Sequence, residues 1–117
     1  RLKSEIWVRA YLRACAVAGA AAVVVRHGDD DAGAIFIKIN RLDGTARLFG
    51  PAPAGIDMGA HDRQWIPHLD ASGTREAEVD AHLERQVKFD PDLWVIEVED
   101  REGRHLLDGW LALSVTS

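Results

Sequence analysis

The segment 33–51, GAIFIKINRLDGTARLFGP, constrains the fold most, because it has the pattern of a β-hairpin. Runs of β-branched and aromatic residues flank Asp43-Gly44, a dipeptide that readily adopts the two positive φ angles of a type I′ turn. A two-residue loop at this position places Ile39 opposite Leu48. Gly44 should then resist substitution, because a β-branched residue fits a positive φ badly.

The predicted register separates two faces of the hairpin. One face is aliphatic and should lie on the core, because water disfavours such a surface. It carries Ile35, Ile37, Ile39, Ala46 and Leu48. The other face combines two aromatic rings, two cations and an amide, on Phe36, Lys38, Asn40, Arg47 and Phe49. We interpret this second face as a binding or interface surface, because aromatic rings on an exposed sheet are costly to leave in water.

Three explanations of this surface remain open. A homodimer or another protein partner could bury it, and we favour this explanation. The long loop or the tail of the chain could instead cover it. A small anionic ligand could stack on the rings and pair with Lys38 and Arg47, in the way that sheet-surface proteins hold a single nucleic-acid strand.

Two elements are predicted ahead of the hairpin. Apolar positions recur at helical spacing over 5–18, between an N-cap candidate at Ser4 and a stop at Gly19. The β-branched run 21–26 predicts a buried strand.

After the hairpin, the Gly- and Pro-rich segment 50–61 predicts a long loop. Residues 63–69 predict a short strand at a sheet edge, because Pro67 has no N–H to donate. Thr74 should cap a second helix that ends near Lys88. Its inward line is Val79, Leu83 and Val87.

The last predicted elements form a second hairpin. Residues 93–98 predict a strand, 100–103 a turn, and 104–107 an antiparallel return strand. The whole order predicts a single α+β domain over 1–117, with a mixed or antiparallel sheet and two helices on one face.

Composition excludes several classes of function. A net charge of −5 argues against general affinity for nucleic acid, because phosphate binding is driven by a cationic surface. The single cysteine, Cys15, cannot form an internal disulfide, and the longest apolar run, 14–25, is too short to span a membrane. We therefore expect a cytoplasmic protein.

Three strings of residues carry a resemblance to a known family. They are 33–44, 48–53 and 89–103, and they resemble a small bacterial family of unknown function, family 1491. The likeness runs from Arg1 to about Leu107. It implies a compact cytoplasmic domain and assigns no catalytic residue.

Enzymatic chemistry has weak support in the sequence. The topology α-β-β-β-α-β makes a small hydrolase or nuclease-like enzyme the alternative, and it would require His61, Asp62, Glu97 and Glu99 to converge. The aspartates of 29–31 indicate a solvated turn rather than a metal loop, so we expect no metal or cofactor. Our leading hypothesis is a non-enzymatic interaction module that self-associates through the sheet face.

Overall fold

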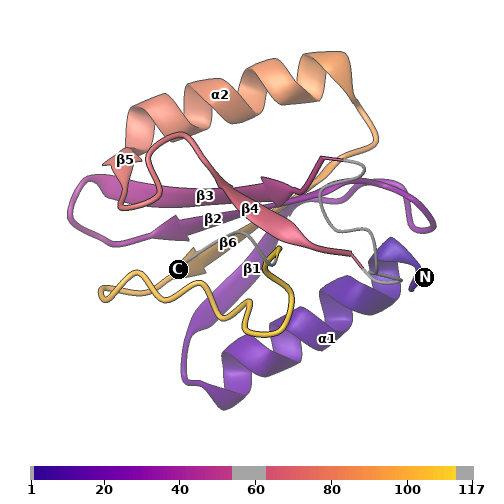
Figure 1. The fold of residues 1–117 in the computed structure, drawn as a ribbon, viewed down its shortest axis with the longest axis horizontal. Helices are drawn as coiled ribbons and strands as arrows, with labels where there is room; N and C mark the ends of the chain where they lie inside the picture. Colours follow the sequence, from indigo (N-terminus) through magenta and orange to yellow (C-terminus); the bar gives the residue numbers. More distant parts are fainter. Residues whose placement is uncertain (1, 54–62, 113–117) are drawn as a thin grey trace.

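The computed structural model describes residues 2–53 and 63–112, and within them six strands form one mixed sheet between two helices (Figure 1). The elements are α1 (Ser4–Val17), β1 (Ala21–Arg26), β2 (Ile35–Asn40), β3 (Thr45–Pro51), β4 (Trp65–His68), β5 (Thr74–Arg75), α2 (Glu76–Phe89) and β6 (Trp94–Glu99). The strand order is β1-β6-β2-β3-β4, and β5 also pairs with β3. Only β2 and β6 run parallel among these pairs. The predicted α+β class is confirmed.

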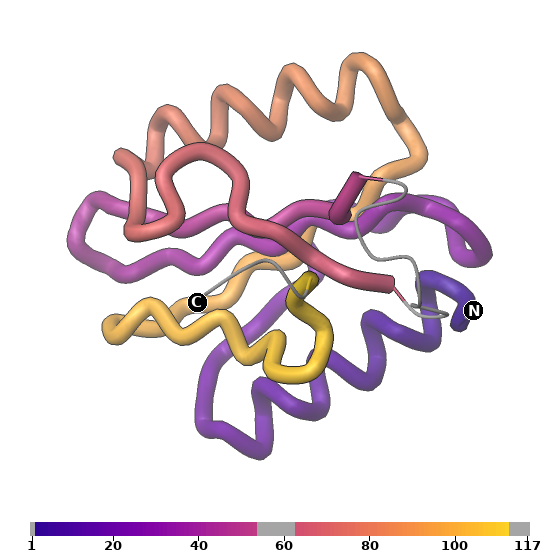
Figure 2. The backbone as a smooth tube through the Cα atoms, in the orientation of Figure 1, coloured from indigo at the N-terminus to yellow at the C-terminus, as the bar shows by residue number. Residues whose placement is uncertain are grey.

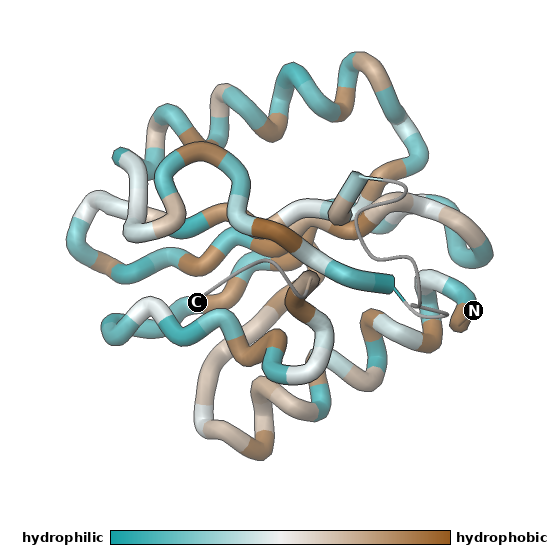
Figure 3. Tube along the Cα trace, viewed as in Figure 1, coloured by the Kyte–Doolittle hydropathy of each residue, from teal (hydrophilic) through white to brown (hydrophobic). Residues whose placement is uncertain are grey.

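The two helices cover opposite faces of the sheet, so the prediction that both lie on one face is wrong (Figure 1). Tyr11 of α1 and Ile37 of β2 belong to one apolar cluster, and Leu83 of α2 and Leu48 of β3 to a second. The physical reason lies in β2, which buries all six of its residues and therefore needs cover on both sides. Hydrophobic residues lie along the central strands and also recur along both helices (Figure 3).

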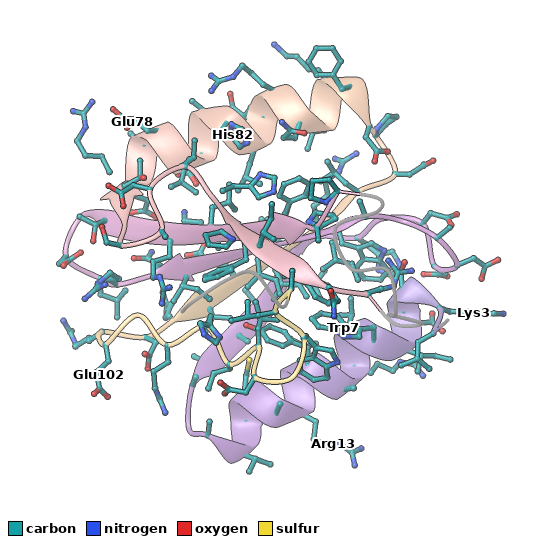
Figure 4. The ribbon with its side chains drawn as sticks, viewed as in Figure 1. Lys3, Trp7, Arg13, Glu78, His82 and Glu102 are labelled. Carbon is teal, nitrogen blue, oxygen red and sulfur yellow. The ribbon has the colours of Figure 1, made fainter. Side chains whose placement is uncertain are left out.

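Helix α1 has the predicted inward stripe but a different start. The buried apolar residues Trp7, Val8, Tyr11 and Cys15 recur at helical spacing (Trp7 is labelled in Figure 4). Ser4 is not the N-cap; it is the first helical residue and is buried. Its hydroxyl donates to the carbonyl of Gly33 at 2.7 Å and accepts from the guanidinium of Arg63 at 2.7 Å. Ser4 thus ties the helix to distant segments instead of capping it.

The hairpin of β2 and β3 forms, but its register is one residue away from the prediction. Ile39 lies opposite Arg47 rather than Leu48, and Ile37 lies opposite Phe49. Residues that lie opposite each other share a face of the sheet. The one-residue step therefore places Arg47 and Phe49 on the α1 side and Leu48 on the α2 side, the reverse of the prediction.

The hairpin loop has three residues, Leu42, Asp43 and Gly44, instead of the predicted two. Side-chain oxygens stabilise it: Asn40 Oδ1 accepts the N–H of Leu42 at 2.8 Å, and Asp43 Oδ1 accepts the N–H of Thr45 at 2.9 Å. Leu42 adopts a φ of 63° and Gly44 one of 88°. The prediction of a type I′ turn was therefore wrong, whereas the predicted positive φ at Gly44 is confirmed.

Gly44→Val is expected to lower the free energy of unfolding by about 1 kcal/mol or more, because valine is strained at positive φ. A Cβ at this position meets no atom within 4 Å, so the cost is backbone strain and not a clash. Urea denaturation measures it, with Gly44→Asn as control, since asparagine tolerates this conformation. Equal stability of the two variants would contradict the expectation.

Strand β1 has the predicted bounds, but it is an exposed outer strand rather than a buried one. Val23 and Val25 are each 60% exposed. A run of β-branched residues has no alternation, so it does not reveal whether the strand lies at the centre or at the edge of a sheet.

The predicted return strand over 104–107 is wrong. Strand β6 is a central strand whose edges are occupied by β1 and β2, so no place beside it is left. The segment 100–112 instead crosses the α1 side of the sheet (Figure 2). There Tyr11 donates to the carbonyl of His105 at 2.7 Å, and the ring of Trp110 lies edge-on to that of Trp7 at 5.1 Å.

The middle of the chain agrees with the prediction in part. Strand β4 forms at an edge with Pro67 in it, and α2 directs Val79, Leu83 and Val87 inward. Thr74 does not cap α2; it belongs to β5, and the helix begins two residues later. Of the predicted loop 50–61, the first two residues belong to β3, and 54–62 lie outside the described residues.

Candidate functional site

The structure divides the five predicted site residues between the two faces of the sheet. Phe36, Lys38 and Asn40 lie on the α2 side, whereas Arg47 and Phe49 lie on the α1 side. Four of them are buried, and Arg47 is half-buried. The expectation of one exposed aromatic and basic face was wrong, because the register slipped and a helix covers each side. Lys38 and Arg47 do not form a joint anion site, since the sheet separates them.

On the α1 side, the side chains of Arg47 and Phe49 pack against each other. The guanidinium carbon of Arg47 lies 4.9 Å from the centre of the Phe49 ring. Its N–H groups donate to the carbonyls of Ala71 at 2.9 Å and Gly103 at 2.7 Å. Arg47 therefore joins the segments around β3 and stabilises the fold there.

On the α2 side, Lys38 lies at the centre of an ionic cluster. Its Nζ donates to Glu76 Oε2 and Asp80 Oδ1, both at 2.7 Å, and lies 3.4 Å from Glu97 Oε1. The amide of Asn40 donates to Glu76 at 3.1 Å and to Glu97 at 3.2 Å. Two predicted site residues thus meet three carboxylates that come from α2 and β6.

The cluster keeps Lys38 protonated. Burial alone would lower the pKa of its ammonium, but the hydrogen bonds to Asp80 and Glu76 and the charge of Glu97 outweigh it, and the pKa is raised. The Lys38 side chain is only 5% exposed. An ammonium that is buried, charged and bonded to carboxylates is not a free amine, so Lys38 is unsuited to act as a nucleophile.

A groove of about 750 Å³ opens beside this cluster, between α2 and the adjacent strands β6 and β1. Helix α2 packs mainly against β3, although Val95 of β6 is also buried against Leu83 of α2. The lining of the groove combines aliphatic side chains with charged ones. The lining includes Val25, Leu83, Val87, Val95, Lys38 and Glu97.

The outer edge of the groove is β1, and sequence reasoning missed this surface. Val23, Val24 and Val25 are all exposed. In the part of the chain that the structure describes, no strand pairs with the outer edge of β1. At the opposite edge of the sheet, by contrast, Trp65 of β4 is bridged by Leu111. The signal available in the sequence was the unbroken valine run, which we interpreted as a mark of burial.

The hydrolase alternative finds no assembled site among residues 2–53 and 63–112. Glu97 is engaged with Lys38 and Asn40, and Glu99 lies at the exposed end of β6. His61 and Asp62 lie outside the described residues. The described ranges contain no group of three or more His, Cys, Asp or Glu that could hold a metal, and no helix in them is long and apolar enough to cross a bilayer.

Comparison with known proteins confirms the predicted family resemblance. The family model described as protein of unknown function (DUF1491) matches residues 2–108. A crystal structure of a DUF1491 family protein from Caulobacter crescentus is 43% identical, with a TM-score of 0.73, covering 91% of this chain and 92% of that one. A solution structure of a protein from A. tumefaciens is 39% identical, with a TM-score of 0.72, covering 85% and 86%. No curated protein matches the chain.

Proposed function

Since this chain belongs to the DUF1491 family, whose description assigns no function, we propose from its geometry that it is a non-enzymatic interaction module that self-associates along the free edge of β1. The proposal keeps the expected homodimer and moves its interface from the sheet face to the sheet edge. A cytoplasmic location, expected from the composition, is part of it.

The observation that carries the proposal is the exposed valine run on an outer strand. An edge strand offers unpaired N–H and C=O groups to another strand, and proteins usually block such edges with lysine, proline or a covering segment. Strand β1 has a single charged residue, Arg26, at one end. The other five residues are alanine or valine, which favour pairing and gain from burial.

A two-fold antiparallel pair of β1 strands fits this surface. Pairing about Val23 places this residue opposite Val23 of the second copy, and Ala21 opposite Val25. The exposed apolar side chains on the groove side then meet, and both α2 helices lie on the same face of one continuous sheet. The two Arg26 side chains fall at opposite ends, so no like charges face each other.

The expected dimer is weak. A bulge between Val24 and Arg26 shifts the register of β1 against β6 and shortens its regular part. Edge bulges reduce strand association. A short strand pair buries an area at the low end for protein interfaces, so we expect dissociation in the micromolar to millimolar range.

Val23→Lys is expected to abolish this dimer without unfolding the protein, because a lysine on the edge must lose its hydration to enter the interface. Val17→Lys, at an 85% exposed position at the end of α1, is the matched control. Sedimentation at about 10 μM and about 1 mM should show association of the wild type and of Val17→Lys only. A wild type that stays monomeric at both concentrations, or a Val23→Lys variant that still associates, contradicts the proposal.

A further inference from the structure

Two histidine side chains meet between α2 and β4, away from the groove and from β1. His82 comes from α2 (labelled in Figure 4) and His68 from β4, and their ring centres lie 6.1 Å apart with planes inclined by 67°. The Nε2 atom of each ring is buried and has no hydrogen-bond partner. Native proteins leave few buried polar atoms unpaired, because such an atom has lost its hydrogen bonds to water without replacing them. Two neighbouring imidazole rings, each with an unpaired buried nitrogen, therefore point to a ligand at this contact.

The surroundings of His68 determine which of its two ring nitrogens carries the lone pair. The carbonyl of Pro51 accepts a hydrogen bond from the ring of His68, and because Nε2 has no partner, the donor is Nδ1. A histidine whose Nδ1–H is bonded to a carbonyl presents an unprotonated Nε2, and this arrangement is usual for metal ligands. Gly50 makes room for the ring, since a Cβ there would lie 2.5 Å from Nε2.

Both rings are neutral at physiological pH. Burial is the main cause that lowers the pKa of His68, and the charge of the neighbouring His82 lowers it further. Burial is also the main cause that lowers the pKa of His82, and the charge of Arg85 lowers it further. Neutral imidazoles keep their lone pairs available, whereas protonated ones would repel a cation.

We propose that His68 and His82 form a two-histidine site for a divalent transition-metal ion such as Zn²⁺ or Cu²⁺, with water as the remaining ligands. A metal–nitrogen bond of about 2.0–2.1 Å puts each ring centre about 3.2 Å from the ion, and two such rings lie about 5–6.5 Å apart for tetrahedral to linear angles. The observed 6.1 Å falls in this range. Imidazole nitrogens select Zn²⁺ or Cu²⁺ over Mg²⁺ and Ca²⁺, which prefer oxygen.

The site is independent of the proposed dimer, because it joins α2 to β4 at the opposite edge of the sheet from β1. Among the described residues no third His, Cys, Asp or Glu completes the pair. Two protein ligands hold a metal less tightly than the four of a structural zinc site, so we expect a dissociation constant on the order of 10 μM. Metal bound there would stabilise the contact between α2 and β4.

Calorimetric titration of the untagged protein with Zn²⁺, Cu²⁺ or Mg²⁺ alone tests the proposal. We expect one equivalent of Zn²⁺ or Cu²⁺ to bind, and Mg²⁺ not to. His68→Ala and His82→Ala should each weaken binding at least tenfold. His27→Ala is the control, since His27 is an exposed histidine paired with Asp30 at 2.7 Å, and it should bind like the wild type. Spectroscopy of bound Cu²⁺ should show nitrogen ligands in the wild type, and these should be lost in His68→Ala and in His82→Ala.

Two results would overturn the proposal. One is the absence of Zn²⁺ and Cu²⁺ binding at about 1 mM metal, in which case a buried water occupies the position between the rings. The other is binding that survives in His68→Ala and His82→Ala alike. Metal-free melting curves check that the variants fold. If His68→Ala does not fold, His82→Ala and His82→Gln decide, because His82 is only half-buried on the helix.

Discussion

Replacing Phe49 with aspartate is expected to unfold the protein. The Phe49 side chain is fully buried, between the Arg47 guanidinium at 4.9 Å and the His105 ring at 5.3 Å. The change removes a large core side chain and buries a carboxylate, and Arg47 offsets it only in part because two backbone carbonyls already hold its N–H groups. We expect a loss of about 4 kcal/mol or more, comparable with the whole stability of a domain of this size.

Phe89→Asp is the matched control, because Phe89 is 88% exposed at the end of α2 and buries little. Circular dichroism with urea denaturation should show a folded control and a largely unfolded Phe49→Asp variant, at every protein concentration. A Phe49→Asp variant that stays folded and merely loses the dimer would revive the sheet-face interface and refute the pairing of Phe49 with Ile37.

Lys38→Met should lower the free energy of unfolding by about 2–3 kcal/mol, because it leaves Glu76, Asp80 and Glu97 together without their cation. The carboxylates are partly exposed, so water compensates some of the loss, and the expected cost lies below that of a fully buried pair. Lys88→Met, on the exposed part of the same groove, is the control and should be nearly neutral.

The same variant has a predicted dependence on pH. The folded state raises the pKa of Lys38 above its ordinary value of 10.5, so its stabilisation is complete below that pH and is lost as the pH rises through the higher folded-state value. Lys38→Met should therefore remove part of the alkaline loss of stability. Wild type and variant with the same pH dependence above about pH 10 would show that the pKa of Lys38 is not raised by folding.

Local patterns in the sequence predicted the elements well, but not their register. The hairpin could be predicted because Asp43-Gly44 lies between two β-branched runs. The loop length depended on two side-chain hydrogen bonds, from Leu42 N–H to Asn40 and from Thr45 N–H to Asp43. These bonds accompany a positive φ at Leu42, which a propensity argument does not favour. One added loop residue then exchanged the faces of a whole strand.

Long-range pairing was beyond sequence reasoning. The parallel pairing of β2 with β6 joins Lys38 to Glu97 across more than fifty residues, and it makes β6 central and β1 an edge. The ionic cluster around Lys38 also depends on the pairing of β2 with β6. Lys38 and Asn40 were identified from the hairpin, but their carboxylate partners come from α2 and β6, and no local pattern predicts that these segments meet.

Amide hydrogen exchange along β1 tests the central claim most directly, because it reports on the edge itself. At about 1 mM protein, the amides of β1 that point away from β6 should exchange more slowly than at about 10 μM, while those of β2 stay unchanged. In Val23→Lys the difference should vanish. Amides of β1 that exchange at the same rate at both concentrations in the wild type would contradict association through this edge.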